Sequence, residues 1–236
     1  MILSGHQPVY LPGIIFFNKM ALSDIFMYVG HVQFSPKSWQ QRNRVALNGQ
    51  ELFLTVPVRK ADRFGQAIDQ VELGVEPWRR KHLGTLKQAY SKRPFFSFYY
   101  PELEFVINQP YDNLGQLNRA LISLIRGWLS IDTKIVERYD FVNISGAKTD
   151  MLIEMCKSVG ASKYLSNEGA RAYVDEEQMG KYNIQHYWQN FSHPIYPQGE
   201  IFLPGMTILD LIFNMGDQSS VIVRSSGSIF KGSING

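Results

Sequence analysis

MILSGHQPVYLPG, residues 1–13, is the stretch that decides the fold. Its apolar start predicts a buried strand over residues 1–5. Residues 6–12 then place His, Gln and Tyr side chains directly before a helical stretch over residues 13–22. Open parallel α/β sheets bind their ligands beyond the carboxyl ends of their strands. The stretch therefore predicts an inner strand of such a sheet, followed by a ligand site.

Strand and helix patterns alternate along much of the chain. Further strands are predicted over residues 24–29, 52–58, 134–138, 164–165 and 184–188. Further helices are predicted from Trp78 to about Pro94, over 113–130 after a cap at Asp112, from Thr149 to Gly160, and from a Thr207/Asp210 capping pair to about Gly216. Asn48-Gly49 predicts a hairpin turn. Because strands joined through helices pair in parallel, we expect an α/β fold with a mostly parallel central sheet flanked by helices, plus additional helical and hairpin elements.

Length and charge bound the class of protein. A chain of 236 residues suits one domain, expected over residues 1–224, and a Gly/Ser-rich tail is expected over 225–236. The net charge of +3 argues against a dedicated DNA-binding protein. Residues 37–93, however, carry twelve Lys and Arg against five Asp and Glu, which suits an anionic small molecule or is simply a solvated basic face.

Several site types are not expected. Cys156 is the single cysteine, so neither an intrachain disulfide nor a cysteine metal cluster can form. The histidines are scattered without metal-binding spacing, so no structural metal is predicted, although Mg²⁺ could accompany a nucleotide. No apolar run approaches the roughly 20 residues of a membrane span, and no secretory signal precedes the first strand, which favours the cytoplasm.

The loop after the first strand carries the expected catalytic residues, His6, Gln7 and Tyr10. A histidine at a strand end can bind a phosphate or act as a general acid or base, because its pKa lies near neutrality. The alternative is that His6 only braces the loop. Lys19, on the following helix, could reach the same site or extend to solvent.

Two further segments are expected to bind substrate or phosphate. Lys37, Trp39, Arg42 and Asn43 combine cations with an aromatic stacking face, although a surface hairpin would explain them too. The loop over residues 166–171 offers the Ser166 hydroxyl, backbone N–H groups and the Arg171 guanidinium, unless it is an ordinary strand-to-helix turn. If both strands belong to one parallel sheet, this loop and that of His6 should line one pocket together with Arg42 and Asn43.

Motifs spread over nearly the whole chain carry a family resemblance. They are HQPxYLP from His6, FxK from Phe17, SD at Ser23, VQF from Val32, WxxRN from Trp39, LTVPV from Leu54, GxKTD from Gly146, YLSxxGAR from Tyr164 and PxxTILDLIFN from Pro204. In these motifs the chain is similar to the WbqC-like protein family. That family is associated with genes for bacterial O-antigen and other surface polysaccharides, and a glycine-transferase role has been suggested for it. The resemblance therefore implies acyl transfer to an amino sugar.

A weaker resemblance links the order strand, His/Gln/Pro loop and helix to nucleotidylyltransferases and pantothenate synthetases. It implies a nucleotidylyltransferase-like (HUP-like) sheet and activation of a carboxylate by ATP, although their paired-histidine motif is missing, with Tyr10 and Gly13 in its later positions. The chain also departs from the WbqC-like pattern. Gly30-His31 stands in place of an acidic pair, Gly13 in place of an aromatic residue, and Asn167-Glu168 in place of a Gly-Pro-like pair.

These interpretations combine into an expected function. We expect an enzyme that forms an amide by acyl or aminoacyl transfer to an amine, with ATP, a carrier protein or an aminoacyl-tRNA supplying the activated donor. One alternative is a non-catalytic protein that binds a nucleotide or nucleotide-sugar in a biosynthetic assembly. The other alternative is a nucleotidyltransferase.

Overall fold

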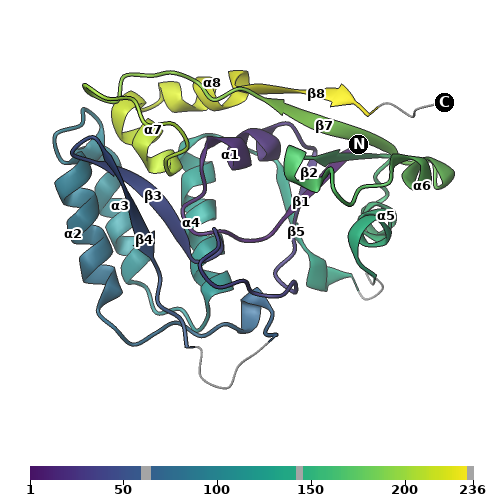
Figure 1. Cartoon of the computed structure of the whole chain (residues 1–236), viewed down its shortest axis with the longest axis horizontal. Helices are drawn as coiled ribbons and strands as arrows, with labels where there is room; N and C mark the ends of the chain where they lie inside the picture. The colour runs from purple at the N-terminus through teal and green to yellow at the C-terminus, as the bar shows by residue number, and fades with distance from the viewer. Residues whose placement is uncertain (60–64, 142–145, 233–236) are drawn as a thin grey trace.

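The computed structural model describes residues 1–59, 65–141 and 146–232. Its centre is a six-stranded sheet in the order β5-β2-β1-β6-β7-β8, whose strands are seen in Figure 1. The strands are β1 (Ile2–His6), β2 (Ile25–Tyr28), β5 (Lys134–Glu137), β6 (Lys163–Ser166), β7 (Gln185–Phe191) and β8 (Gly227–Lys231). The first strand is thus an inner strand, as its apolar sequence predicts.

Pairing within the sheet is parallel except at one edge. β1 pairs in parallel with β2 on one side and with β6 on the other, and β7 continues in parallel from β6. Only β8 is antiparallel, against β7. From β1 the chain adds β2 and then β5 on one side of the sheet, and it later adds β6, β7 and β8 on the other side. The direction in which strands are added therefore reverses between β1 and β6. Such a reversal opens a crevice at the carboxyl ends of the two strands.

Helices cover both faces of this sheet. They are α1 (Ile14–Ala21), α2 (Trp78–Tyr90), α3 (Phe96–Asn108), α4 (Leu114–Trp128), α5 (Lys148–Val159), α6 (Glu176–Lys181), α7 (Ile208–Met215) and α8 (Gln218–Ser225). Alternate residues of β2 divide the core: Phe26 and Tyr28 join a large cluster with α1 to α4 and α7, whereas Ile25 and Met27 join a smaller one with α5 and α6. The expected α/β fold is confirmed.

A two-stranded hairpin lies outside the central sheet, beside α2 (Figure 1). β3 (Arg42–Leu47) and β4 (Gln50–Thr55) are antiparallel, and both turn residues, Asn48 and Gly49, have positive φ of 52° and 72°. Asn-Gly adopts this backbone readily, which is why it marks a tight hairpin. The hairpin turn is confirmed, and the strand expected over residues 52–58 belongs to this hairpin.

Three local expectations were wrong. The helix expected to end near Pro94 ends at Tyr90, and a second helix, α3, follows it and includes Pro101. The cap of α4 is Asn113, whose side chain accepts the Gln116 N–H, and not Asp112. Residues 227–231 are not a loose tail but form the edge strand β8, because antiparallel pairing satisfies their backbone groups along β7.

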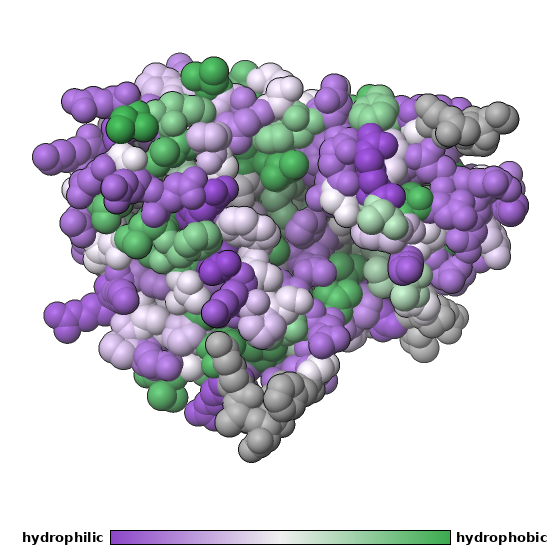
Figure 2. Space-filling view, viewed as in Figure 1, coloured by the Kyte–Doolittle hydropathy of each residue, from purple (hydrophilic) through white to green (hydrophobic). Residues whose placement is uncertain are grey.

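No helix in the described part of the chain is long and apolar enough to cross a membrane. On the face shown in Figure 2, apolar and polar residues are intermixed.

Candidate functional site

Two cavities lie side by side where β1 and β6 end. The larger, of about 310 Å³, lies against α1, and the smaller, of about 260 Å³, lies against α5. His6, Lys19 and Asn167 line both of them. His6 is the last residue of β1 and Asn167 directly follows β6, so the cavities meet at the point where the strand order reverses. The loops after β1 and β6 therefore share these cavities, as expected. Of the two residues expected with them, Asn43 lines only the larger cavity and Arg42 lines neither.

His6 presents a neutral imidazole to this junction. Its Nδ1 lies 2.8 Å from the carbonyl oxygen of Gln7. A carbonyl oxygen can only accept, so Nδ1 carries the proton and Nε2 carries a lone pair. Burial, and secondarily the charge of Lys19, lower the pKa of His6 to about 3. The ring also packs edge-on against Phe16, which fixes its orientation.

Lys19 is the residue whose role the sequence left open. It lies in the last turn of α1, and its Nζ donates to the carbonyl oxygen of Gly5 at 2.9 Å, consistent with the tilt of helical side chains toward the N-terminus. The residue is only 4% exposed, and burial lowers its pKa to about 7. An amine with this pKa exchanges a proton near neutral pH. The signal in the sequence was a lysine within the apolar helix IIFFNKMA.

The first turn of α1 forms part of the larger cavity. Gly13, Ile14 and Ile15 all line it, and the N-cap Gly13 has no side chain that could cap the helix. A side chain at Gly13 would enter this space, with its Cβ 3.2 Å from the carbonyl oxygen of Met206. The first-turn N–H groups and the helix dipole favour a negatively charged group here.

The hairpin and its preceding loop form another wall of the larger cavity. Trp39 is half exposed and lines it with Asn43 and Arg44. Asn43 braces the loop between β1 and α1, since its Nδ2 donates to the carbonyl oxygens of Leu11 at 2.7 Å and Tyr10 at 3.3 Å. Arg44 forms an ion pair with Glu51 and donates a hydrogen bond to the Gly205 carbonyl oxygen. The hairpin is therefore also tied to the segment before α7, where Gly205 lines the same cavity.

Of the other predicted residues, two lie at the smaller cavity. Gln7 lines it and accepts a hydrogen bond from Gln40 through its side-chain oxygen. Ser166 lines it as well, with its Oγ 2.9 Å from Nε2 of His186.

Four predicted residues line neither cavity. Tyr10 is fully buried in the core and its hydroxyl lies 2.9 Å from His82 Nδ1, so it packs the loop instead of facing ligand. Lys37 is exposed on the loop before the hairpin. Arg42 stacks its guanidinium over the Phe53 ring at 4.4 Å. Arg171 forms an ion pair with Glu168 and covers the Trp188 ring at 4.4 Å, so its charge is already matched.

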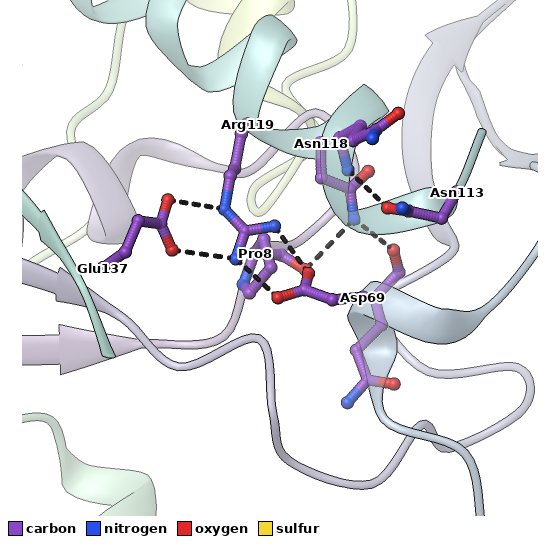
Figure 3. A network of polar contacts seen from close by, with 8 residues as sticks. Pro8, Asp69, Asn113, Asn118, Arg119 and Glu137 are labelled. Carbon is purple, nitrogen blue, oxygen red and sulfur yellow. Dashed lines mark hydrogen bonds and ion pairs between the residues drawn. The ribbon is translucent and has the colours of Figure 1, made fainter. Parts of the chain in front are cut away.

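Helix α4 holds the loops around the site in place (Figure 3). Nδ2 of Asn118 donates to the carbonyl oxygens of Pro8 at 3.0 Å and Gln40 at 2.8 Å, one in each loop that borders the cavities. The next residue, Arg119, forms ion pairs with both Asp69 and Glu137. This single helix therefore ties four distant segments together.

The same network explains Gly30, which stands where an acidic residue was expected. A Cβ at Gly30 would lie 2.0 Å from Oδ2 of Asp69 and 2.5 Å from Nη2 of Arg119. A side chain at this position would therefore displace Asp69 and Arg119 from their present contact. The carboxylate beside this position is thus that of Asp69, and Arg119 neutralises it.

Within the described ranges, no three His, Cys, Asp or Glu side chains gather in a way that could hold a metal ion.

Comparison with known proteins gives the chain a family. It is 29% identical over 221 residues to the uncharacterized protein Rv1507c of Mycobacterium tuberculosis (strain ATCC 25618 / H37Rv). The matched region covers 92% of this chain and 95% of that protein. No solved structure matches the chain. The model of the WbqC-like protein family matches residues 7–222, nearly the whole length. The chain therefore belongs to the WbqC-like protein family.

Proposed function

We propose that this protein forms an amide by transferring an acyl or aminoacyl group, of the glycyl type, to an amine such as that of an amino sugar. The observation that carries the proposal is a buried lysine with a pKa of about 7 beside a neutral imidazole, where two cavities meet. Two adjoining cavities suit a reaction that joins two substrates. Proximity and orientation alone supply much of the rate enhancement in such a reaction.

Lys19 is the proposed general base. An amine attacks an acyl carbon only after it has lost a proton, and a base whose pKa lies near the working pH removes that proton best. Neutral Lys19 takes the proton, and the resulting ammonium then stands beside the developing oxyanion. His6 orients the amine, because its free Nε2 lone pair accepts one of the amine hydrogens.

The shapes of the cavities suggest how the substrates divide between them. The larger cavity has the α1 N-terminus for a phosphate and the Trp39 ring for a base or sugar, which fits a nucleotide-linked amino sugar. The smaller cavity would take the acyl group.

We favour a donor that arrives already activated, on a carrier protein or a tRNA, over activation by ATP with Mg²⁺. The reason is that Lys37, Arg42 and Arg171, the cations expected at the phosphates of ATP, line neither cavity. We place the reaction in the cytoplasm, where such donors are made.

The test offers nucleotide-linked amino sugars together with glycyl-tRNA, a glycyl thioester, or glycine with ATP and Mg²⁺, and follows the mass of the amide product. Lys19→Met should lower kcat by about 100-fold or more and remove the pH-dependent limb near pH 7, since general-base catalysis contributes about 10²–10⁴-fold. Lys87→Met, an exposed lysine on α2, is the matched control and should retain full activity.

Each other outcome has a definite meaning. Tight binding of the nucleotide sugar without turnover by any donor would establish a non-catalytic binding protein instead. Release of pyrophosphate with a nucleotidylated product would establish a nucleotidyltransferase. Unchanged kcat in the Lys19→Met protein would remove this residue from the mechanism.

A further inference from the structure

A chain of three polar side chains runs from the smaller cavity into the protein. Ser166, at the end of β6, lines that cavity, and its Oγ lies 2.9 Å from Nε2 of His186 on β7. Nδ1 of His186 lies 3.4 Å from Oε1 of Glu176, the first residue of α6. Strand register explains the first contact: Tyr164 pairs with His186 and Ser166 with Trp188, so all four side chains share one face of the sheet.

The positions of the protons follow from these contacts. The carboxylate of Glu176, whose Oε1 lies 3.4 Å from Nδ1, favours the proton of neutral His186 on that nitrogen through its negative charge, although the two atoms form no hydrogen bond. Nε2 is then the acceptor for the Ser166 hydroxyl. Burial lowers the pKa of His186, and the imidazole is therefore in its basic form at neutral pH. Nucleophile, base and carboxylate stand in the relation that activates a serine in hydrolases of several folds.

The surroundings hold the chain of contacts in place. The His186 ring stacks on Tyr164 and meets Trp188 edge-on, with centroids 4.5 Å apart in the second case. Trp188 also donates its Nε1–H to Glu176, which fixes the carboxylate. A catalytic group needs such locked positions.

A purely structural role explains these residues less well. A buried polar network that only stabilises the fold has its donors and acceptors satisfied. Among the described residues, neither His186 Nδ1 nor Glu176 Oε2 has a hydrogen-bond partner, although both atoms are buried. The serine, moreover, faces a cavity that His6 and Lys19 also line.

We propose that Ser166 is a nucleophile, with His186 as its base and Glu176 as the residue that orients the imidazole, and that Ser166 carries the acyl group as an ester. The transfer to an amine rests on the function proposed above. The acyl group is of the glycyl type of that function, and the smaller cavity, of about 260 Å³ and lined in part by Met155 and Tyr164, has room for it.

The steps balance without a further reactant. His186 takes the Ser166 proton while Oγ bonds to the acyl carbon; the bond to the leaving group then breaks, and that group departs with the proton. An amine, whose ammonium form has first lost a proton to Lys19, next attacks the ester carbon; His186 takes a second proton from its nitrogen and passes it to Oγ as the bond between Oγ and the acyl carbon breaks. The sum is an acyl donor and an amine giving an amide and the free leaving group. Lys19 and Asn167, which line the same cavity, are placed to stabilise the oxyanion.

The test uses two probes that need no amine, a fluorophosphonate and p-nitrophenyl acetate, followed by intact and peptide mass spectrometry of the full chain. We expect one adduct per chain on the peptide that contains Ser166. His186→Gln should slow labelling by about 100-fold or more, and Glu176→Gln should slow it by about 10-fold and shift its pH profile. Ser219→Ala removes another buried serine, which has no imidazole partner, and should label like the wild type.

The outcomes separate this inference from the proposed function. Failure of the folded wild type to label at Ser166, or labelling that His186→Gln leaves unchanged, overturns the nucleophile. Full amide formation by Ser166→Ala also overturns it, while direct transfer at Lys19 stands. Labelling of Ser166 without any amide product supports the nucleophile and contradicts the proposed acceptor. Should Ser166→Ala not fold, Ser166→Cys should alkylate with iodoacetamide faster in the presence of His186 than in the double variant with His186→Gln.

Discussion

At the scale of single residues, the most consequential feature is that an ionisable amine is buried where a ligand would bind. Lys19 is 4% exposed and its Nζ donates to one backbone carbonyl, that of Gly5. A charged ammonium in this position has lost most of its hydration, and that loss destabilises the folded state. Proteins retain such strained groups mainly where they serve chemistry, because apolar replacements of the same size stabilise the fold.

This reasoning predicts that Lys19→Met stabilises the protein. In the unfolded chain the lysine keeps its ordinary pKa of 10.5, whereas in the folded protein its pKa is about 7. Between pH 7 and 10.5 the unfolded wild-type chain therefore binds more protons than the folded one, and the free energy of unfolding of the wild type rises with pH. At pH 7 the variant should gain about 2–4 kcal/mol in free energy of unfolding, part of the gain being offset by the lost hydrogen bond.

Urea denaturation at several pH values measures this effect. The difference between variant and wild type should be largest at pH 7 and below and should shrink as the pH approaches 10. Lys87→Met, on an exposed helical face, should change stability by less than about 0.5 kcal/mol. A Lys19→Met protein that is less stable at pH 7 would show that the amine is well solvated.

The position of a residue at the end of a strand was easier to predict from the sequence than the contacts that its side chain makes. A histidine at the end of the first strand was correctly placed at a cavity, because strand position alone puts it at the sheet edge. Arg42, Asn43 and Arg44 alternate along β3, and only Asn43 and Arg44 line the cavity. Which of these side chains meets a ligand depends on how the hairpin docks against the loop of Tyr10. That docking is a tertiary contact without a local sequence signal.

At the scale of elements, the helix with the clearest apolar periodicity also organises the site. Asn118 and Arg119 of α4 are adjacent in sequence and project to different neighbours, one to the loops at Pro8 and Gln40 and the other to an ion-pair network (Figure 3). Periodicity predicted the buried face of this helix. It gave no sign that Asn118 would hold the loop after β1 or that Arg119 would join an ion-pair network.

Asn118→Ala should therefore loosen the loop around His6. The substitution leaves the buried carbonyl oxygens of Pro8 and Gln40 without their donor, and we expect a loss of about 1–3 kcal/mol in free energy of unfolding. Hydrogen exchange should become faster in the loop between β1 and α1. Asn108→Ala, at an exposed end of α3, serves as the control. Stability within about 0.5 kcal/mol of the wild type would show that water replaces the asparagine at no cost.

The elements that the sequence did not predict share one physical cause. α3 contains Pro101, which by itself argues against a helix, but Tyr99, Leu103 and Ile107 lie buried at helical spacing and packing overrides the proline. β8 has a Ser- and Gly-containing sequence typical of a tail, yet it pairs with β7 and forms the edge of the sheet. In both cases tertiary contacts supply the stability that local preference lacks.

At the scale of the whole molecule, strand order brings distant segments together. Alternation of strands and helices predicted parallel pairing, and parallel pairing places the loops after β1 and β6 at the same edge. The reversal of strand order between them could not be read from local sequence, since it depends on where each later strand joins the sheet. This reversal creates the two adjoining cavities and puts His6 beside Asn167.

The last prediction concerns this convergence. His6 and Asn167 line the same two cavities, whereas Arg171 lies on Trp188 in an ion pair with Glu168. In the amide-forming assay, the effects of His6→Ala and Asn167→Ala on kcat/KM should be non-additive, with a coupling of about 0.5–3 kcal/mol, because each removal disturbs the position of the same substrate. His6→Ala combined with Arg171→Ala should be additive within about 0.5 kcal/mol, as for sites that share no partner. Additive losses in the first pair, together with coupling in the second, would mean that the ligand lies over Arg171 and Trp188 instead of at the junction of the two cavities.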